Sequence, residues 1–157
     1  MAILEFIESS YLAATPFCDA DSSKIRQAAA NIVGTETCPR KKASQIFYWV
    51  RDSVKYELGL NQDKASETLQ KGFGSCSNKA NLFVAMMRTL GIPAGFHTMY
   101  VKGKDYLGVF CSPKFHLFMG EKSLHAYCSV FLENQWIKVD PDRKSTRLNS
   151  SHGYRYR

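Results

Sequence analysis

Several features that would place a chain in a familiar class are missing from this sequence of 157 residues. It has no apolar run of about 18 residues, the length that a membrane-spanning helix needs. Residues 1–8 lack a basic start and carry two acids, so they do not resemble a secretory signal. Neither a glycine-rich phosphate loop nor an acidic calcium loop occurs. We therefore expect no membrane partner and no cofactor.

The cysteines are too scattered for a disulfide framework or a structural zinc site. Their number is odd, and no CxxC pair occurs among them. Reduced thiols are typical of cytosolic proteins, so a cytoplasmic location is predicted. Most of these side chains are expected to be small buried groups. The five positions are Cys18, Cys38, Cys76, Cys111 and Cys128.

Positive charge is concentrated at the end of the chain. The net charge is +7, but residues 143–157 contain five lysines and arginines and no acid. The remaining 16 basic side chains stand against 14 acidic ones, so the rest of the chain is nearly neutral. The basic composition therefore gives no reason to expect a nucleic-acid partner.

The last 16 residues differ from the rest in pattern as well as in charge. Residues 142–152 follow neither a helical nor a strand period. Their sequence, DRKSTRLNSSH, matches the translation of a common sequencing-library adapter. We therefore expect one domain over residues 1–141, truncated at its C-terminus, and a non-native basic tail over residues 142–157.

The first half of the chain has helical patterns. Apolar residues recur at helical spacing over residues 22–33 and 39–53. Pro39 stands near the first turn of the second segment, with Thr37 as a candidate cap. A shorter helix is predicted over residues 63–69.

The segment 76–90 predicts a helix of a different kind. It follows a glycine-containing break and ends at Gly91, with Pro93 two residues later, which is a strong stop signal. Apolar residues occur around most of its circumference. A helix of this kind is usually central, covered by a sheet and by other helices.

Strand patterns follow the helices. Helices first and strands second indicate an α+β fold, with N-terminal helices packed on an antiparallel sheet. The predicted strands cover residues 96–101, 107–111, 115–119, 124–132 and 135–140.

The last two strands predict a specific register. If Glu133 and Asn134 form a two-residue hairpin loop, Cys128 faces Val139 and Tyr127 faces Asp140. One face of the hairpin is then apolar and the other is polar, and a slip of one residue would mix the faces. His125 shares the face of Asp140, so the two are diagonal neighbours with backbones about 7–8 Å apart.

Three residues form a candidate nucleophilic site. Cys76 stands at the predicted start of a helix, where the unpaired N–H groups and the helix dipole favour a thiolate. His125 could take the thiol proton and return it to a leaving amine. Asp140 could accept a hydrogen bond from the other ring nitrogen and orient the ring.

Each of the three also has an ordinary explanation. A lone cysteine is usually buried filler, a histidine on a half-buried strand is usually structural, and Asp140 before a proline is typical of a strand-end turn. His97 and His116 have no matching carboxylate and are expected to be structural. Trp49 and Trp136 are expected in the core, whereas Tyr127 and Phe131 are candidates for an acyl-binding groove.

Several motifs resemble transglutaminase-like domains, and they occur in the same order over roughly residues 40–141. They correspond to the helix before the nucleophile, the nucleophile loop, the rest of the nucleophile helix with its stop, and the strands that carry the histidine and the aspartate. In that order they are residues 43–56, 65–69 with 72–80, 82–88 with 91–94, 125–127 and 136–141.

The resemblance implies a papain-like α+β core with the nucleophile at the N-terminus of a central helix. It implies Cys76 as the nucleophile, His125 as the base and Asp140 as the orienting group. The function implied is hydrolysis or transfer of acyl groups from a peptide or protein amide, or from an acyl thioester. The sequence does not choose between water and an amine as acceptor. A catalytically silent binding domain, and a zinc site formed by the same three residues, are the alternatives.

Overall fold

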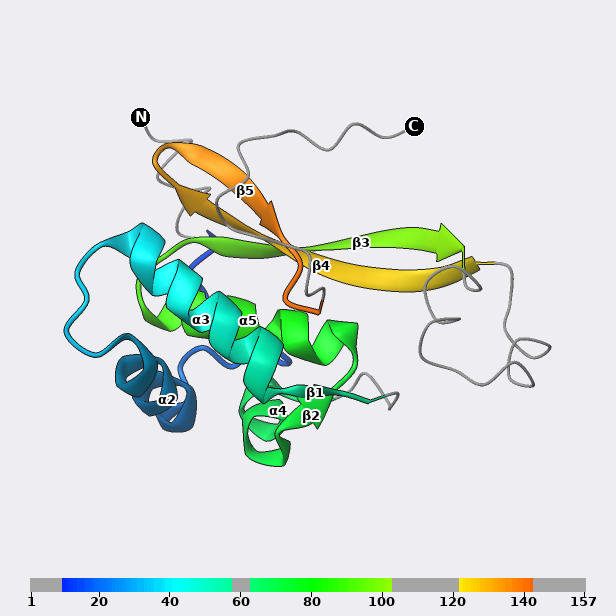
Figure 1. Cartoon of the computed structure of the whole chain (residues 1–157), viewed down its shortest axis with the longest axis horizontal. Coiled ribbons are helices and arrows are strands. Elements are labelled where there is room, and N and C mark those ends of the chain that lie inside the picture. The colour runs from blue at the N-terminus through cyan, green and yellow to red at the C-terminus, as the bar shows by residue number, and fades with distance from the viewer. Residues whose placement is uncertain (1–9, 58–62, 103–121, 143–157) are drawn as a thin grey trace.

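The computed structural model describes residues 10–57, 63–102 and 122–142 (Figure 1). The predicted strands over 107–111 and 115–119, and His116, lie outside the described residues. In chain order the elements are α2 (Ser23–Val33), α3 (Pro39–Ser53), β1 (Lys55–Tyr56), α4 (Ala65–Lys71), β2 (Phe73–Gly74), α5 (Cys76–Thr89), β3 (Ala94–Lys102), β4 (Lys122–Leu132) and β5 (Gln135–Val139).

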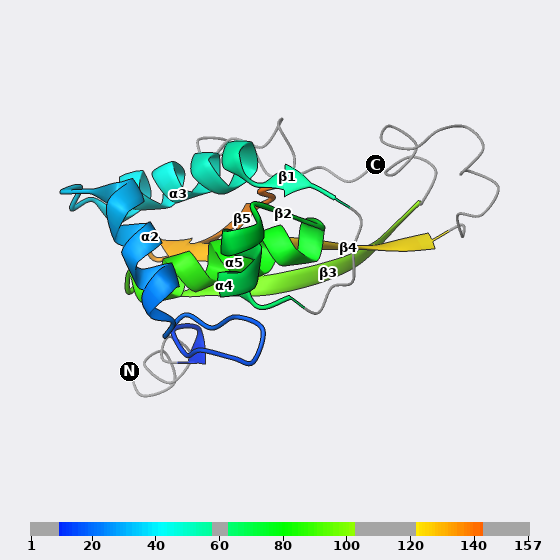
Figure 2. The same ribbon diagram turned by 90° about the horizontal axis from the view of Figure 1, so that it is seen from below.

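The helices form one layer and the main sheet forms the other. Among the described residues the sheet has three antiparallel strands, in the order β3–β4–β5. Helix α5 packs against β3 and β4, and α2, α3 and α4 pack around α5 (Figure 2). The predicted α+β class, with N-terminal helices packed on an antiparallel sheet, is confirmed.

Helix α5 is the centre of the core, as its all-round apolar pattern predicts. Most of its side chains are buried, and they include Leu82, Phe83, Val84, Met86 and Met87 at 0% exposure. The Sγ atom of Cys128 on β4 contacts the carbonyl oxygen of Ala80 at 3.6 Å. The buried face of the sheet therefore lies directly on this helix.

The helix boundaries agree with the sequence patterns to within two residues. Helix α3 begins at Pro39 as predicted, but the N-cap is Cys38 rather than Thr37. Helix α4 begins two residues later than predicted, because the side chain of Glu67 accepts a hydrogen bond from the backbone N–H of Lys64 and fixes Lys64 as its N-cap.

One pairing was not predicted. Strand β1 pairs in parallel with β2, and each has only two residues, too few to show a strand period. The backbone N–H of Lys55 donates to the carbonyl of Gly72 at 2.9 Å, and that of Glu57 donates to the carbonyl of Gly74 at 3.1 Å. These bonds tie the end of α3 to the loop that precedes Cys76.

The β4–β5 hairpin has the predicted register. Leu132 pairs with Gln135, and the pairing continues without a slip to Cys128 and Val139. Glu133 and Asn134 have φ angles of 52° and 61°, which is the left-handed backbone of a two-residue hairpin turn. The ladder ends at Val139, so Asp140 lies just beyond the paired strand rather than opposite Tyr127.

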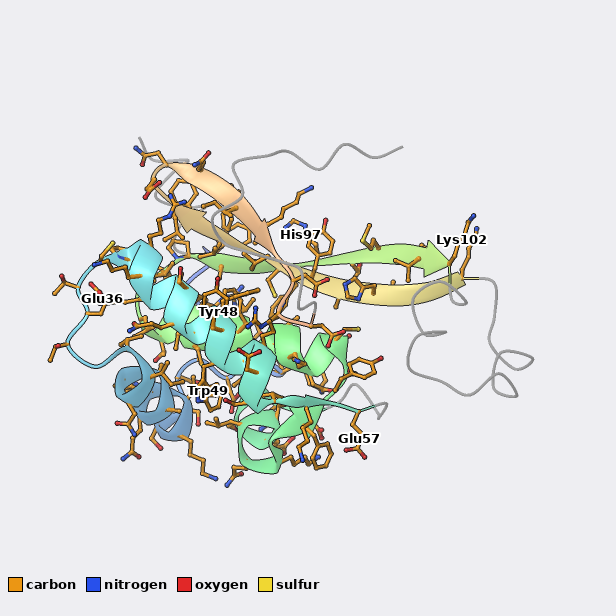
Figure 3. The ribbon with its side chains drawn as sticks, in the orientation of Figure 1. Glu36, Tyr48, Trp49, Glu57, His97 and Lys102 are labelled. Carbon is orange, nitrogen blue, oxygen red and sulfur yellow. The ribbon has the colours of Figure 1, made fainter. Side chains whose placement is uncertain are left out.

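Strands β3 and β4 are longer than the sequence pattern indicates. They remain paired from Ala94 and Val130 to Lys102 and Lys122. Their far ends extend past the helices as a two-stranded arm, with Lys102 near its tip (Figure 3). Within the described residues, no helix has the length and apolar character needed to cross a membrane.

Candidate active site

Cys76 is the first residue of α5 and is held there by a cap. The Ser75 hydroxyl accepts a hydrogen bond from the backbone N–H of Asn78, and the Asn78 side chain accepts one from the N–H of Ser75 at 3.0 Å. This reciprocal cap satisfies backbone donors in the first turn of the helix. Cys76 is buried, with 8% of its surface exposed.

The loop before Cys76 requires a glycine at position 74. A Cβ atom at Gly74 would lie 2.6 Å from the Cβ atom of Asn78, far closer than two carbon atoms approach without displacement. Gly74 therefore allows the backbone to pass close to the capping residue, and this close approach fixes where α5 begins.

The structure brings the three predicted residues together. Nε2 of His125 lies 2.8 Å from Oδ2 of Asp140, and the His125 ring is near enough to the Cys76 side chain for each group to shift the pKa of the other. His125 comes from β4, and Asp140 directly follows β5. His125 is 2% exposed and Asp140 is 9% exposed, so this contact is shielded from solvent.

The electrostatic surroundings favour an ionised Cys76 and a protonated His125. Burial disfavours the thiolate, but hydrogen bonds from His125 and from the Ala126 backbone outweigh it, so the pKa of Cys76 lies below its usual value. Burial also disfavours the imidazolium, but the hydrogen bonds with Asp140 and Cys76 raise the pKa of His125 to about 9. Each group therefore stabilises the charged form of the other.

The other buried cysteines have the opposite character. Burial raises the pKa of Cys18 to about 11 and raises that of Cys128 well above its usual value. Cys38 is exposed at the start of α3 and has no such surroundings. Among the described cysteines, Cys76 alone combines a nearby imidazole with a lowered thiol pKa.

Lys79 and Asp142 lie beside the three candidate residues, and the sequence analysis did not predict their place there. Nζ of Lys79 lies 3.6 Å from Oδ1 of Asp142, and the backbone N–H of Asp142 donates to Oδ1 of Asp140 at 3.1 Å. A sequence signal was available, because Lys79 is one of two cations, with Arg88, in a helix that is apolar around most of its circumference. The pairing of Lys79 with Asp142 could be recognised only in the folded structure.

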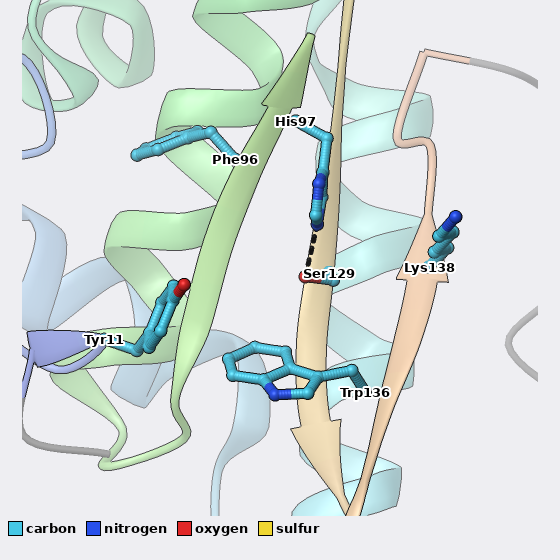
Figure 4. Close-up of a pocket in the computed structure, with 6 residues that line it drawn as sticks. All are labelled: Tyr11, Phe96, His97, Ser129, Trp136 and Lys138. Atoms are coloured by element: carbon cyan, nitrogen blue, oxygen red, sulfur yellow. Dashed lines mark hydrogen bonds between the residues drawn. The ribbon is translucent and has the colours of Figure 1, made fainter. Parts of the chain in front are cut away.

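A second feature of the sheet is an aromatic hollow of about 310 Å³ that does not include the three residues. Trp136 is 40% exposed there, so its predicted place in the core is wrong, whereas Trp49 packs against the core as predicted (Figure 3). The hollow is lined by Tyr11, Phe96, His97, Ser129, Trp136 and Lys138 (Figure 4).

The contacts of His97 account for its place in this hollow. Its Nε2 atom lies 2.8 Å from the Ser129 hydroxyl, and its ring stacks on Tyr127. Phe131 packs against Trp136. The structural role expected for His97 stays a prediction, and Tyr127 and Phe131 contact hollow-lining rings. No cluster of three metal-binding side chains is found within the described segments.

Two solved structures share this fold. A candidate cysteine protease from Cytophaga hutchinsonii aligns with 85% of this chain at a TM-score of 0.69 and 24% identity, over 41% of its own length. The periplasmic domain of TgpA from Pseudomonas aeruginosa, bound to ethylmercury, aligns with 87% of this chain at a TM-score of 0.59 and 18% identity, over 49% of its own length.

A curated relative and a family profile also match the sequence. An uncharacterised protein of Haemophilus influenzae is 34% identical over 89 residues, which are 54% of this chain and 24% of that protein. This chain thus spans about a quarter of the relative's length. The profile of the transglutaminase-like superfamily matches residues 26–141. Since that match covers well over half of the chain and includes Cys76, His125 and Asp140, the chain belongs to the transglutaminase-like superfamily.

Proposed function

We propose that this chain is a cysteine-nucleophile enzyme that transfers or hydrolyses acyl groups. Cys76 is the nucleophile, His125 the general acid and base, and Asp140 the orienting group. The observation that carries the proposal is the convergence of the three side chains: His125 is hydrogen-bonded to Asp140 and lies beside Cys76, the pKa of Cys76 is lowered, and that of His125 is raised to about 9. A thiolate–imidazolium pair is the reactive state of Cys–His nucleophiles.

The chemistry follows from that pair. The Cys76 thiolate attacks the carbonyl carbon of an amide or thioester, and the carbonyl oxygen becomes an oxyanion. The backbone N–H of Cys76, at the N-terminus of α5, is a candidate donor to that oxygen. His125 then gives its proton to the departing amine or thiol, while Asp140 keeps the ring in place. The product is a thioester between the acyl group and Cys76.

The acyl group then leaves to water or to an amine. For either acceptor, His125 takes the proton and the Cys76 thiolate is released. Water gives a peptidase or amidase, and an amine gives an acyltransferase. We propose a peptide or protein amide, or an acyl thioester, as the substrate. The candidate cysteine protease with the same fold is consistent with the amide.

The location of the reaction stays a prediction. The four described cysteines are free thiols, which fits the cytoplasmic location proposed from the sequence. One solved structure with the same fold is described as a periplasmic domain, and that description applies to its own protein.

A catalytically silent binding domain is the competing function. Such a domain would have no need for a low-pKa thiol beside an oriented imidazolium. The observed electrostatics at Cys76 and His125 therefore favour the enzyme.

The test is alkylation of the whole chain by iodoacetamide as a function of pH, with each cysteine quantified by mass spectrometry. Cys76 in the folded chain should react with a midpoint below that of the same cysteine in the urea-unfolded chain, and His125→Ala should move its midpoint upward. An acyl-electrophile probe should label Cys76, and Cys76→Ala should abolish that labelling. Equal midpoints for Cys76 in the folded and unfolded chain, or probe capture at another residue, would contradict the proposal.

A further inference from the structure

Lys79 is a buried cation close to the candidate nucleophile. It lies three residues after Cys76 on α5, and its side chain is 3% exposed. A buried ammonium group is costly unless it is paired and hydrogen-bonded. Here Nζ lies 3.6 Å from Oδ1 of Asp142 and donates to the carbonyl oxygen of Arg51 at 3.3 Å. The charge is therefore held in a defined place between α3 and the turn after β5.

The turn that Lys79 contacts also holds the orienting carboxylate. The backbone N–H of Asp142 donates to Oδ1 of Asp140, while Oδ2 of Asp140 bonds His125. Both oxygens of Asp140 are thus engaged, and one of them depends on the position of Asp142. The Asp142 side chain is itself only 5% exposed, so its charge is not well screened by water.

The charge of Asp142 also acts on the nucleophile. Burial and the neighbouring carboxylate of Asp142 both oppose ionisation of Cys76, and His125 and the Ala126 N–H overcome them. A cation that neutralises Asp142 removes part of this opposition.

We infer that Lys79 is a positioning residue for the proposed active site. Its ammonium group neutralises Asp142 and fixes the turn over residues 140–142, so that Asp140 stays aimed at His125 and no uncompensated negative charge faces Cys76. The inference rests on the proposed function of Cys76. Lys79 itself touches none of the reacting atoms and acts through Asp142.

The groups that face Lys79 come from two neighbouring elements. Asp142 and Asp140 lie on the turn after β5, and Asp52 lies on α3. Burial lowers the pKa of Lys79, while these three carboxylates favour its charged form, and the net pKa lies below the usual value. Arg51 forms two hydrogen bonds with Asp52. Of the three carboxylates, Asp142 therefore has the largest electrostatic effect on Lys79.

The experiment is a double-mutant cycle on the full chain with Lys79→Met, Asp142→Asn and the double variant. The inference concerns this 157-residue chain, in which Asp142 is the first residue of the segment predicted to be non-native. Both members of the pair are varied so that their coupling is measured. The readout is the pH midpoint of Cys76 alkylation, checked by the ultraviolet absorbance of its thiolate. A purely structural role in packing would not move this midpoint.

Lys79→Met should raise the midpoint, lowering the alkylation rate at fixed pH by about threefold or more, because an unpaired carboxylate disfavours the thiolate. Asp142→Asn should lower it, and the double variant should return toward the parent value. An unchanged midpoint in folded Lys79→Met would overturn the inference. If that variant does not fold, an unchanged midpoint in Asp142→Asn would do the same.

The two proposals fail in different ways. An ordinary midpoint for Cys76 in the parent chain argues against the proposed function, whatever the variants do. A low parent midpoint that does not respond to Lys79 or Asp142 argues against the inference alone.

Discussion

At the scale of single residues, the decisive group is the His125 imidazole. It is held between a carboxylate and a thiol, and both neighbours stabilise its protonated form. Asp140 and Cys76, which lie far apart in the sequence, thus both raise the pKa of His125. Two properties can be tested at this scale: the pKa of His125, and the close approach of the backbone at Gly74 to Asn78.

Asp140→Asn should lower the pKa of His125 from about 9 toward the ordinary value of 6.5. An amide can still accept a hydrogen bond, but it supplies no negative charge to stabilise the imidazolium. The measurement is a ¹H–¹⁵N NMR titration of the imidazole, with His97, which contacts Ser129 and Tyr127, as internal reference. An unchanged His125 titration would show that Asp140 is not its stabilising partner.

The same pKa shift predicts a dependence of stability on pH. Because the pKa of His125 is raised on folding, its contribution to stability is fully present below about pH 6.5. It is lost as the pH rises through about 9, where the folded protein releases the proton. In a Cys76→Ser background, which removes the coupled titration of the thiol, the free energy of unfolding lost on His125→Gln should therefore shrink as the pH rises from about 6.5 toward 9 in urea titrations. A constant difference over that window would contradict this assignment.

Gly74→Ala should destabilise the chain by about 1–3 kcal/mol, because the new Cβ would overlap the Cβ of Asn78. The cost should be smaller in an Asn78→Gly background, where the overlapping atom is absent. Urea unfolding of the two single variants and the double variant measures this coupling. Additive losses would show that the close approach is not the cause.

At the scale of elements, two local devices place the site. The Ser75–Asn78 cap sets the first residue of α5, and the two-residue turn at Glu133 and Asn134 sets the register of the hairpin. A slip of one residue in that hairpin would turn His125 and Asp140 to opposite faces. The turn at Glu133 and Asn134 therefore helps to place His125 and Asp140 on the same face, although it lies away from both.

Asn134→Ala should destabilise the hairpin by about 1 kcal/mol, because a Cβ-bearing residue other than Asn or Asp is strained at a φ of 61°. Asn134→Gly is the matched control and should be neutral or stabilising, since glycine adopts this backbone without strain. Thermal unfolding of the two variants gives the comparison. Equal stability of the alanine and glycine variants would contradict the turn assignment.

At the scale of the whole molecule, helix α5 contacts both the sheet and the other described helices. It carries Cys76 at one end, and its sides contact the sheet and helices α2, α3 and α4. The positions of His125 and Asp140 relative to Cys76 thus depend on how the sheet packs on α5. The aromatic packing of Phe47 on α3 against Phe83 on α5 holds the opposite side of this helix.

Phe83→Ala should cost about 3–5 kcal/mol, the range for removing a buried aromatic ring, because Phe83 is 0% exposed. That loss is a large part of the stability of an ordinary domain. Tyr48→Ala is the control, since Tyr48 lies on α3 and is 39% exposed, and its cost should be much smaller. Urea unfolding of the two variants decides, and similar costs would contradict the central role of α5.

Local patterns predicted a large part of the fold. The stop at Gly91 and Pro93 gave the end of α5, and the alternation around Glu133 and Asn134 gave a hairpin register that is confirmed. The placement of His125 beside Asp140 followed from that register. These features depend on residues near one another in the sequence, so a period or a turn signal reports them directly.

Other features depended on contacts between distant segments. The β1–β2 pair, the exposure of Trp136 and the burial of Lys79 against Asp142 have no local signature. Each depends on which surfaces come into contact when the sheet packs on the helices. The residue period of a short segment does not report such contacts.

The sequence by itself determined the central helix, the hairpin register and the three residue types needed for nucleophilic chemistry. Only the tertiary structure decided that Cys76 meets His125, and that Lys79 is buried beside the turn that holds Asp140. The physical reason is that secondary structure arises from short-range backbone geometry, whereas burial and charge pairing are properties of surfaces that the folded chain brings together.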